Sequence, residues 1–396
     1  MNDRTAKSIA DLDWGLLTLV LTILGFGLVM LTSASISVAD NSTGQPFYYL
    51  IKQLVAVAAG IVVAGVVLKT PTDIWQRLAP VLFIFAVVLL ALVLIPGVGR
   101  EVNGSTRWLS VGGINIQVSE PARLLVLMYI SSYAVRHRDD FGVSIKNFLQ
   151  PMILIALVCT LLLAEPDFGA TFVILLISLS VLFVAGVPLR YFLGLCVIVV
   201  AGLAALVVSA PYRLARLTGF TDPWKDPFDS GFQLTQSLIA IGSGEWFGAG
   251  LGNSVQKLFY LPEAHTDFVF AVFAEEFGLV GTIILIGLFS ALVWRAYSIA
   301  MDAAARDRYY QAYLAFGIAI WQGAQVFINL GVNMGILPTK GLTLPLISYG
   351  RSSLIVTLAA LALLLRIDME TRGLAVSTSR RGKTKARESG EGKKRK

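Results

Sequence analysis

The sequence predicts an all-α, polytopic membrane protein of about ten transmembrane helices, with a large outer loop between the seventh and the eighth. Hydrophobic residues make up 56 % of the 396-residue chain, and charged residues only 14 %. A soluble domain of this length needs far more charge to cover its surface, so the composition excludes that class. Apolar runs also recur along the chain at close to the length, about 20 residues, that crosses the hydrocarbon core.

These apolar runs define the predicted spans, which lie at residues 14–38, 50–68, 78–95, 121–135, 148–163, 168–187, 189–210, 268–297, 310–336 and 342–365. The first run is too long for a signal peptide and has no small-residue cleavage site, so we expect it to remain as the first helix. The chain then divides into a cytoplasmic N-terminus at 1–13, seven helices within 14–210, the large outer loop at 211–267, three helices within 268–366 and a disordered, basic cytoplasmic tail at 367–396.

Lysine and arginine residues set the predicted orientation, because short cytoplasmic loops carry an excess of both. Placing the N-terminus inside puts most basic residues of the short loops on the cytoplasmic side, and an even number of spans returns the C-terminus there. The net charge of +7 is concentrated in the tail, which has no apolar periodicity. We therefore expect the tail to be attracted to anionic lipid, and no nucleic acid as a partner.

The outer loop at 211–267 is too long and too aromatic for a simple connection. It contains Trp224, Trp246 and several Phe and Tyr residues, and its leucines and isoleucine at 234, 238 and 241 recur at helical spacing. Loops of this length in compact proteins are usually functional or disordered. The aromatic content favours a segment that lies on or dips into the outer membrane interface.

This loop ends in the densest group of ionisable residues at a predicted membrane boundary, with Lys257, Glu263, His265 and Asp267 close together in the sequence. A carboxylate that is partly shielded from water has a raised pKa, which suits a general base near neutral pH. An aspartate at the start of a helix can equally serve as an N-cap or contact a partner. From spacing alone, both interpretations of Asp267 stay open.

Glu120 and Arg123 open the fourth predicted span three residues apart, so they share one helix face and can pair. Ionisable residues inside a span are expensive and mark candidate functional sites. The pair is either a neutralised structural ion pair or a pair that positions a reactive group in a polar cavity.

A third cluster precedes the last span, where Lys340, Ser348 and Arg351 lie in a stretch rich in Gly, Pro and Ser. Small residues near a helix start leave backbone N–H groups open to an anion, and the basic residues add charge, which suits a diphosphate. The alternative is a re-entrant loop whose small residues allow tight helix contact. The chain has no Walker loop, HExxH motif or dinucleotide-binding fingerprint.

Several of these segments resemble one known family. The blocks are NGSTRW at 103–108, GSG at 242–244, GLGNSVQK at 250–257, LPEAHTDF at 261–268 and SYG at 348–350, in an ordered resemblance from about 12 to 372. The chain resembles the shape, elongation, division and sporulation (SEDS) proteins. The LPTKGL block at 337–342 resembles the cell-division branch of that family.

The resemblance implies a peptidoglycan glycosyltransferase that polymerises lipid II at the outer face of the bacterial cytoplasmic (inner) membrane, at the division septum. It also implies a class B penicillin-binding protein transpeptidase and other division proteins as partners. The family's essential aspartate falls on Asp267, and its acidic and basic pair falls on Glu120 and Arg123, where the family more often has lysine at the second position.

The implied mechanism is one inverting displacement in which Asp267 removes the proton from the acceptor hydroxyl and undecaprenyl diphosphate leaves. The candidates for stabilising or binding the substrate are Arg107, Arg123, Lys257, His265, Lys340 and Ser348. No cofactor is expected beyond, at most, a divalent cation at the diphosphate. A lipid II flippase and a scaffold that recruits the transpeptidase remain alternative functions.

Overall fold

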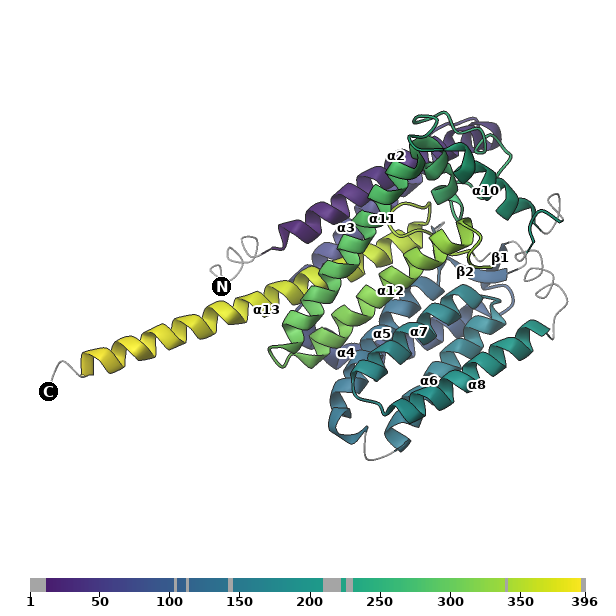
Figure 1. Cartoon of the computed structure of the whole chain (residues 1–396). Helices are drawn as coiled ribbons and strands as arrows, with labels where there is room; N and C mark the ends of the chain where they lie inside the picture. The colour runs from purple at the N-terminus through teal and green to yellow at the C-terminus, as the bar shows by residue number, and fades with distance from the viewer. Residues whose placement is uncertain are drawn as a thin grey trace.

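The computed structural model describes residues 12–102, 105–111, 114–141, 145–208, 222–225, 231–338 and 341–392. It is a bundle of long helices, with a small β-sheet at one end and a long C-terminal helix that extends beyond the bundle at the other (Figure 1). The helices are α2 (Trp14–Thr43), α3 (Tyr48–Lys69), α4 (Thr72–Val93), α5 (Ser119–Arg136), α6 (Ile145–Ala164), α7 (Phe168–Val184), α8 (Leu189–Val208), α10 (Phe232–Ser243), α11 (Val269–Ala304), α12 (Tyr309–Asn333) and α13 (Arg351–Gly392), with a 3-10 turn, η1, at Arg138–Asp140.

The structure confirms a mostly helical, multi-span membrane protein. Among the described residues, seven helices are long and apolar enough to cross a membrane, namely α2, α3, α4, α6, α11, α12 and α13. The predicted spans at 121–135, 168–187 and 189–210 correspond to α5, α7 and α8, of which α7 and the apolar part of α8 are shorter than the others. The number of crossings stays a prediction.

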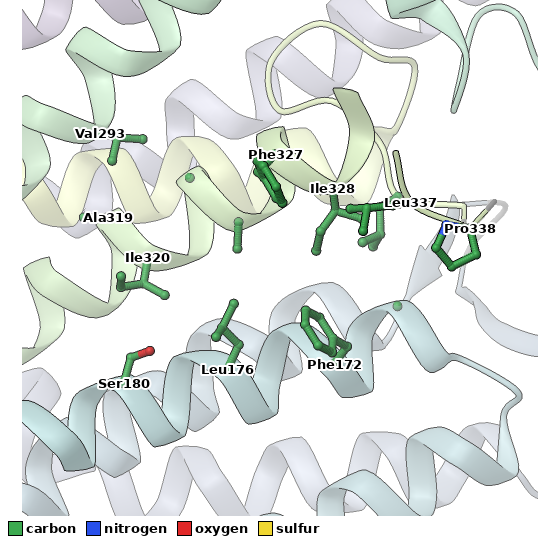
Figure 2. Close-up of a pocket in the computed structure, with 14 residues that line it drawn as sticks. Phe172, Leu176, Ser180, Val293, Ala319, Ile320, Phe327, Ile328, Leu337 and Pro338 are labelled. Atoms are coloured by element: carbon green, nitrogen blue, oxygen red, sulfur yellow. The ribbon is translucent and has the colours of Figure 1, made fainter. Parts of the chain in front are cut away.

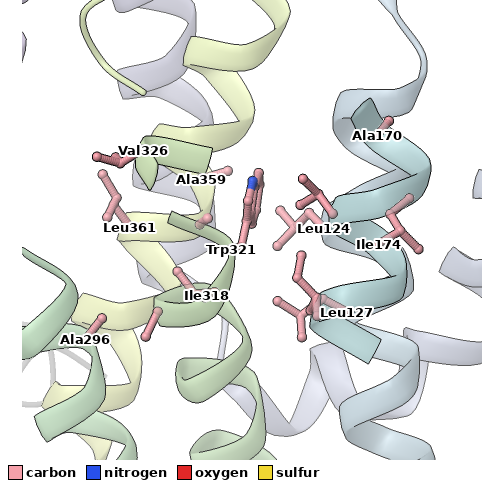
Figure 3. Packing of buried hydrophobic residues seen from close by; sticks show 14 of the residues in the cluster. Leu124, Leu127, Ala170, Ile174, Ala296, Ile318, Trp321, Val326, Ala359 and Leu361 are labelled. Atoms are coloured by element: carbon pink, nitrogen blue, oxygen red, sulfur yellow. The ribbon is translucent and has the colours of Figure 1, made fainter. Parts of the chain in front are cut away.

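The helices differ sharply in how much of their surface is buried, and this places the core. In the most apolar stretch of α12, 72 % of the residues are buried, and in that of α13, 83 %, whereas α3 buries only 22 %. Almost every residue of α5 is buried as well. Trp321 of α12 lies fully buried against Leu124 and Leu127 of α5 (Figure 3). The centre of the bundle is therefore built from α5, α12 and α13, while α3 and α4 present apolar side chains outward, as lipid contact requires.

A three-stranded antiparallel sheet lies between α4 and α5, so the prediction of an all-α protein is wrong for this segment. Its strands are β1 (Gly99–Val102), β2 (Ser105–Val111) and β3 (Ile114–Gln117), in the order β1-β2-β3. Trp108 pairs with Arg100 on one side and with Gln117 on the other. The register between β1 and β2 shifts between Arg100 and Glu101, so Arg107 has no partner on β1. Such a bulge interrupts the regular alternation and can redirect a side chain, here that of Arg107.

Helix α11 is broken at Gly278, whose φ of 66° and ψ of −165° are not helical. The backbone groups released by the break are bound by a loop that follows α10. The N–H groups of Ala249 and Gly250 donate to the carbonyls of Glu275 and Glu276, at 2.9 and 3.1 Å. Such compensation is necessary because an unpaired backbone group in a membrane costs several kcal/mol (roughly 2–7).

The predicted disorder of the tail at 367–396 is wrong for residues 367–392, which are helical, and residues 393–396 lie outside the described residues. Helix α13 continues to Gly392 (Figure 1). Ile367, Asp368 and Thr371 are buried against the bundle. The acidic and basic residues here pair with neighbouring helices, which composition alone does not reveal.

Candidate active site

Asp267 lies in the turn that leads into α11, at the end of the bundle that carries the sheet and α10, here called the Asp267 end. It caps no helix, because the residue at the N-cap position of α11 is Phe268, and the N–H of Ala271 in the first turn donates to Oδ1 of Asn333 at 3.2 Å. The N-cap interpretation of Asp267 is therefore wrong. Among the residues that the structure describes, its carboxylate receives no hydrogen bond and forms no ion pair, although its backbone is firmly held.

The environment of Asp267 raises the pKa of its carboxyl group to about 7. Burial is the largest cause, and the negative charge of Glu263 adds to it, while the positive charge of Arg107 opposes both. A carboxylate with a pKa near the working pH is both sufficiently ionised and sufficiently basic to accept a proton.

Two asparagines of α12 hold the backbone of Asp267, and sequence reasoning missed both. The side-chain amides of Asn329 and Asn333 donate to the carbonyl oxygen of Asp267, at 2.9 and 3.0 Å. Asn329 also donates to the carbonyl of Leu342 at 2.7 Å, so one amide ties together the two segments that meet at the site. Buried amides recurring every four residues in an apolar helix are the signal that could have revealed them.

Gly341, in the segment between α12 and α13, lies against the carboxylate of Asp267. A Cβ atom at this position would lie 2.7 Å from Oδ2 of Asp267, closer than real contacts allow. The close approach therefore requires a glycine at 341.

The structure brings Arg107, one of the predicted substrate-binding candidates, to this site. Its guanidinium donates to the backbone carbonyls of Glu165 and Pro166, at 3.1 and 2.6 Å. It is also close enough to lower the pKa values of Asp267 and Glu165. Neither backbone bond neutralises its charge, so the guanidinium can still act on an anion.

Glu165 is a buried carboxyl group that was not among the predicted site residues. It is fully buried, and neither oxygen has a hydrogen-bond partner among the described residues. Burial and the neighbouring charge of Asp167 raise its pKa to about 8, although Arg107 works in the opposite direction. Asp167 itself caps α7 by accepting from the backbone N–H of Ala170 at 3.0 Å, which is the structural role expected from its position.

Glu120 and Arg123 form the predicted pair, with 3.4 Å between Nη1 of Arg123 and Oε2 of Glu120, both buried. Arg123 also donates to the side chain of Gln325 at 3.0 Å and lies over the ring of Trp321. Gln325 in turn donates to the carbonyl of Thr343 at 2.9 Å, in the segment that carries Gly341. The pair supports the walls of the site and has no direct contact with Asp267 among the described residues.

Lys257 is not brought to Asp267. Its ammonium is buried and lies 2.7 Å from Oε1 of Glu276 and 2.8 Å from the hydroxyl of Ser33. The reason is that Glu276 lies inside α11 near the break, where an unpaired carboxylate would be expensive. The structure thus contradicts the expectation that Lys257 contacts a diphosphate.

His265 and Ser348 lie near Asp267 but are engaged in the architecture. The ring of His265 packs 4.6 Å from that of Tyr49, between centroids, and burial lowers the pKa of the imidazole. The hydroxyl of Ser348 is buried and accepts from the N–H of Leu344, which closes a turn and favours the packing interpretation of this segment. Lys340, the remaining candidate, lies outside the described residues.

An apolar cavity of about 550 Å³ reaches the site from the side, between α7 and α12 (Figure 2). Phe172 and Leu176 of α7 line one wall, Phe327 of α12 lines the other, and Pro338 and Leu342 close the end next to Gly341. Phe327 is 64 % exposed, so the cavity opens to the lipid-facing surface of the bundle. Its lining is apolar except for Ser180, and is therefore suited to a hydrocarbon chain.

The described residues contain no group of three or more His, Cys, Asp or Glu side chains that could hold a metal ion.

Comparisons with known proteins agree with this architecture. The probable peptidoglycan glycosyltransferase FtsW of Thioalkalivibrio sulfidiphilus is 54 % identical over 360 residues, covering 91 % of this chain and 90 % of that protein. The protein of the same name from Legionella pneumophila is 50 % identical and covers 93 % of both.

Solved structures are similar too. The rod shape determining protein RodA of Thermus thermophilus matches with a TM-score of 0.67 at 33 % identity, over 90 % of this chain and 96 % of that one. A chain from a peptidoglycan synthase complex that coordinates polymerization and crosslinking matches with a TM-score of 0.75 at 33 % identity, over 91 % and 98 %. A family model for cell cycle proteins, FtsW, RodA and SpoVE, covers residues 14–373. The chain therefore belongs to the FtsW/RodA/SpoVE family of cell cycle proteins, and within it is most similar to FtsW.

Proposed function

We propose that this chain is a peptidoglycan glycosyltransferase that polymerises lipid II into β-1,4-linked glycan strands during cell division. The observation that carries the proposal is the carboxylate of Asp267, unpaired among the described residues and with its pKa raised to about 7, beside Gly341, whose neighbour Leu342 lines a lipid-sized apolar cavity. The names of the FtsW relatives at 50–54 % identity support the same activity.

Asp267 accepts the proton of the 4-hydroxyl group of the acceptor sugar, and the resulting oxygen attacks the anomeric carbon of the donor. The new C–O bond forms as the bond to the diphosphate breaks, and that electron pair leaves with undecaprenyl diphosphate. A single displacement converts the α-linked donor into a β-linked product, so a second nucleophilic carboxylate is unnecessary.

Arg107 stabilises the negative charge that develops on the diphosphate, because its guanidinium faces Asp267 without a carboxylate partner of its own among the described residues. Lys340 is the second candidate on sequence grounds. Glu120 and Arg123 act indirectly, by holding Gln325 and the segment that contains Gly341. A divalent cation at the diphosphate would add charge stabilisation without a dedicated protein site.

The cavity between α7 and α12 gives the undecaprenyl chain a lateral route from the bilayer. Its lining is apolar along the wall and its mouth lies on the lipid-facing surface. The diphosphate and sugars of the same molecule would then lie at the closed end, beside Gly341 and Asp267.

For topology, we propose ten crossings, with α5, α7 and α8 added to the seven long apolar helices and with both termini in the cytoplasm. The Asp267 end then faces outward from the bacterial inner membrane at the septum, where lipid II is available. A class B penicillin-binding protein would crosslink the product, an arrangement supported by the similarity to a synthase complex that couples polymerization to crosslinking. Other division proteins would recruit the pair.

The test is polymerisation of purified lipid II by the chain together with its transpeptidase, with the wild type compared with Asp267→Asn. We expect glycan strands from the wild type and none from the variant. Equal products from both would disprove the role of Asp267.

The same preparation separates the alternatives. If neither protein polymerised lipid II but the wild type moved it across vesicles, a flippase would be the function. If cells divided normally with only the Asp267→Asn variant, the chain would serve as a scaffold.

A further inference from the structure

A second cavity, polar and about 450 Å³ in volume, lies at the opposite end of the bundle from Asp267. It lies between the start of α4 and the end of α5, and its lining residues are Asp73, Gln76, Arg77, Pro80, Ser132 and Arg136. We call this end the basic end, because it also carries Lys69, Arg138, Arg306 and Arg308. The proposed glycosyltransferase reaction has no use for this cavity.

A specific contact between α4 and α5 holds the cavity in shape. Pro80 has no N–H group, so the carbonyl of Gln76 lacks its partner within α4. The hydroxyl of Ser132 on α5 donates to this carbonyl at 3.2 Å and so replaces the missing bond. The proline and the serine therefore join the two helices at a fixed distance, with Arg77 and Arg136 on the facing surfaces.

The two arginines are exceptional at this end in having no partner. Neither guanidinium forms an ion pair or a hydrogen bond with another residue in the described part of the chain, and both are exposed. Four other arginines of the same region, by contrast, pair with acidic side chains, namely Arg295, Arg308, Arg366 and Arg372. Two unpaired guanidinium groups across one cavity favour an anion with several oxygens.

The level of the cavity in the membrane indicates which molecule supplies that anion. Helix α4 begins its apolar span at Thr72, so its first two turns lie at the membrane boundary. At this depth the abundant phosphate is that of a phospholipid headgroup.

We propose that this cavity binds the phosphodiester of a membrane phospholipid, with Arg77 and Arg136 on the phosphate oxygens. Gln76 lines the same cavity and offers an amide donor. Asp73 adds one carboxylate, which attracts an ammonium group, whereas the neutral glycerol of a phosphoglycerol headgroup has no charge for it to attract. The cavity therefore selects a zwitterionic aminophospholipid, such as one with a phosphoethanolamine headgroup, over a phosphoglycerol lipid.

The experiment measures lipid retention by the purified full chain with native mass spectrometry, after exchange into detergent with defined phosphoethanolamine or phosphoglycerol lipid. We expect the wild type to retain phosphoethanolamine lipid and Arg77→Gln/Arg136→Gln to bind it at least about tenfold more weakly, since two charge-assisted contacts are lost. Lys69→Gln/Arg306→Gln is the matched control, because it removes two exposed charges from the same end without touching the cavity. Asp73→Asn should bind both lipids alike.

Three results would overturn the proposal. One is equal retention by the cavity variant and the control variant. Another is displacement of the lipid by millimolar inorganic phosphate, which would make the cavity a site for the free ion. The third is a wild-type preference for the phosphoglycerol lipid, which would contradict the role of Asp73. Polymerisation of lipid II by each variant, measured in parallel, reports whether the protein is folded.

Discussion

Two aspartates of this protein precede long helices and yet have opposite properties. Asp13 caps α2 by accepting from the N–H groups of Gly15 and Leu16, and its carboxylate pairs with Arg295. Burial alone would raise the pKa of Asp13, but the hydrogen bonds from Arg295 and Leu16 and the charges of Arg295 and Arg372 hold it below its usual value. Asp267 caps nothing, and its pKa is raised to about 7.

The difference extends to the surroundings of each aspartate. At the basic end, Asp13, Arg295, Asp368 and Arg372 form one connected group of opposite charges. At the Asp267 end, the carboxylates of Asp267 and Glu165 lack partners among the described residues, and Arg107 is held by backbone carbonyls alone. Paired charges stabilise the bundle, whereas unpaired ones are available for chemistry.

The largest expected effect comes from removing each carboxylate in turn. Asp267→Asn should lower the rate of lipid II polymerisation about 10²–10⁴-fold, the usual range for a lost general base. Asp13→Ala should leave that rate nearly unchanged but destabilise the protein by about 2 kcal/mol, because it loses both the cap of α2 and the ion pair with Arg295. Polymerisation assays and thermal unfolding of both variants test the comparison. A loss of stability without loss of activity in Asp267→Asn would reverse the two assignments.

A smaller effect is expected from crowding the Asp267 carboxylate. Gly341→Ala places a methyl group against Oδ2, so the carboxylate must move, and a shift of about 1 Å can lower the rate about 100-fold. Gly350→Ala is the matched control in the same segment, because its Cβ would meet Ser353 and Thr343 at an ordinary 3.5 Å. Equal rates for the two variants would show that the close approach of residue 341 is unimportant.

The next largest effect is expected from removing a side-chain amide of α12. Asn329→Leu keeps a similar volume but removes both bonds to the carbonyls of Asp267 and Leu342, so we expect a rate lower by about tenfold, from roughly 1.4 kcal/mol of lost positioning. Gln322→Leu is the control on the same helix, because the Gln322 side chain is buried without a partner among the described residues. That variant should be active and at least as stable as the wild type. Polymerisation rates and unfolding midpoints distinguish the two.

The smallest effects are shifts along the pH axis. Asp267 must be ionised to accept a proton, so kcat/KM should rise as the pH increases through about 7 and fall on acidification. Glu263→Gln removes a negative charge that raises the pKa of Asp267, so its curve should move to lower pH. Arg107→Gln removes the opposing positive charge, so its curve should move to higher pH, with a lower maximum. Shifts in the same direction would refute this electrostatic account.

The candidate site was partly predictable from the sequence. Asp267 and Arg107 were identified and the structure brings them together, and Glu120 and Arg123 form the pair that their spacing of three residues predicts. Lys257 was predicted to reach the same place but is held by Glu276 and Ser33. The sequence does not show whether Lys257 pairs with Glu276 or reaches Asp267. The outcome depends on the position of Glu276, which lies next to the break in α11.

The sequence by itself determined that the protein is mostly helical and crosses the membrane several times, because hydrophobic burial in lipid acts on each segment of about 20 residues separately. It also identified the ionisable residues at span ends. Only the tertiary structure decided that Asn329 and Asn333 hold Asp267, that Glu165 is buried unpaired and that Asp13 is neutralised while Asp267 is not. The physical reason is that the pKa of an acid depends on burial and on charges from other helices, and that pairing is fixed only when the helices pack.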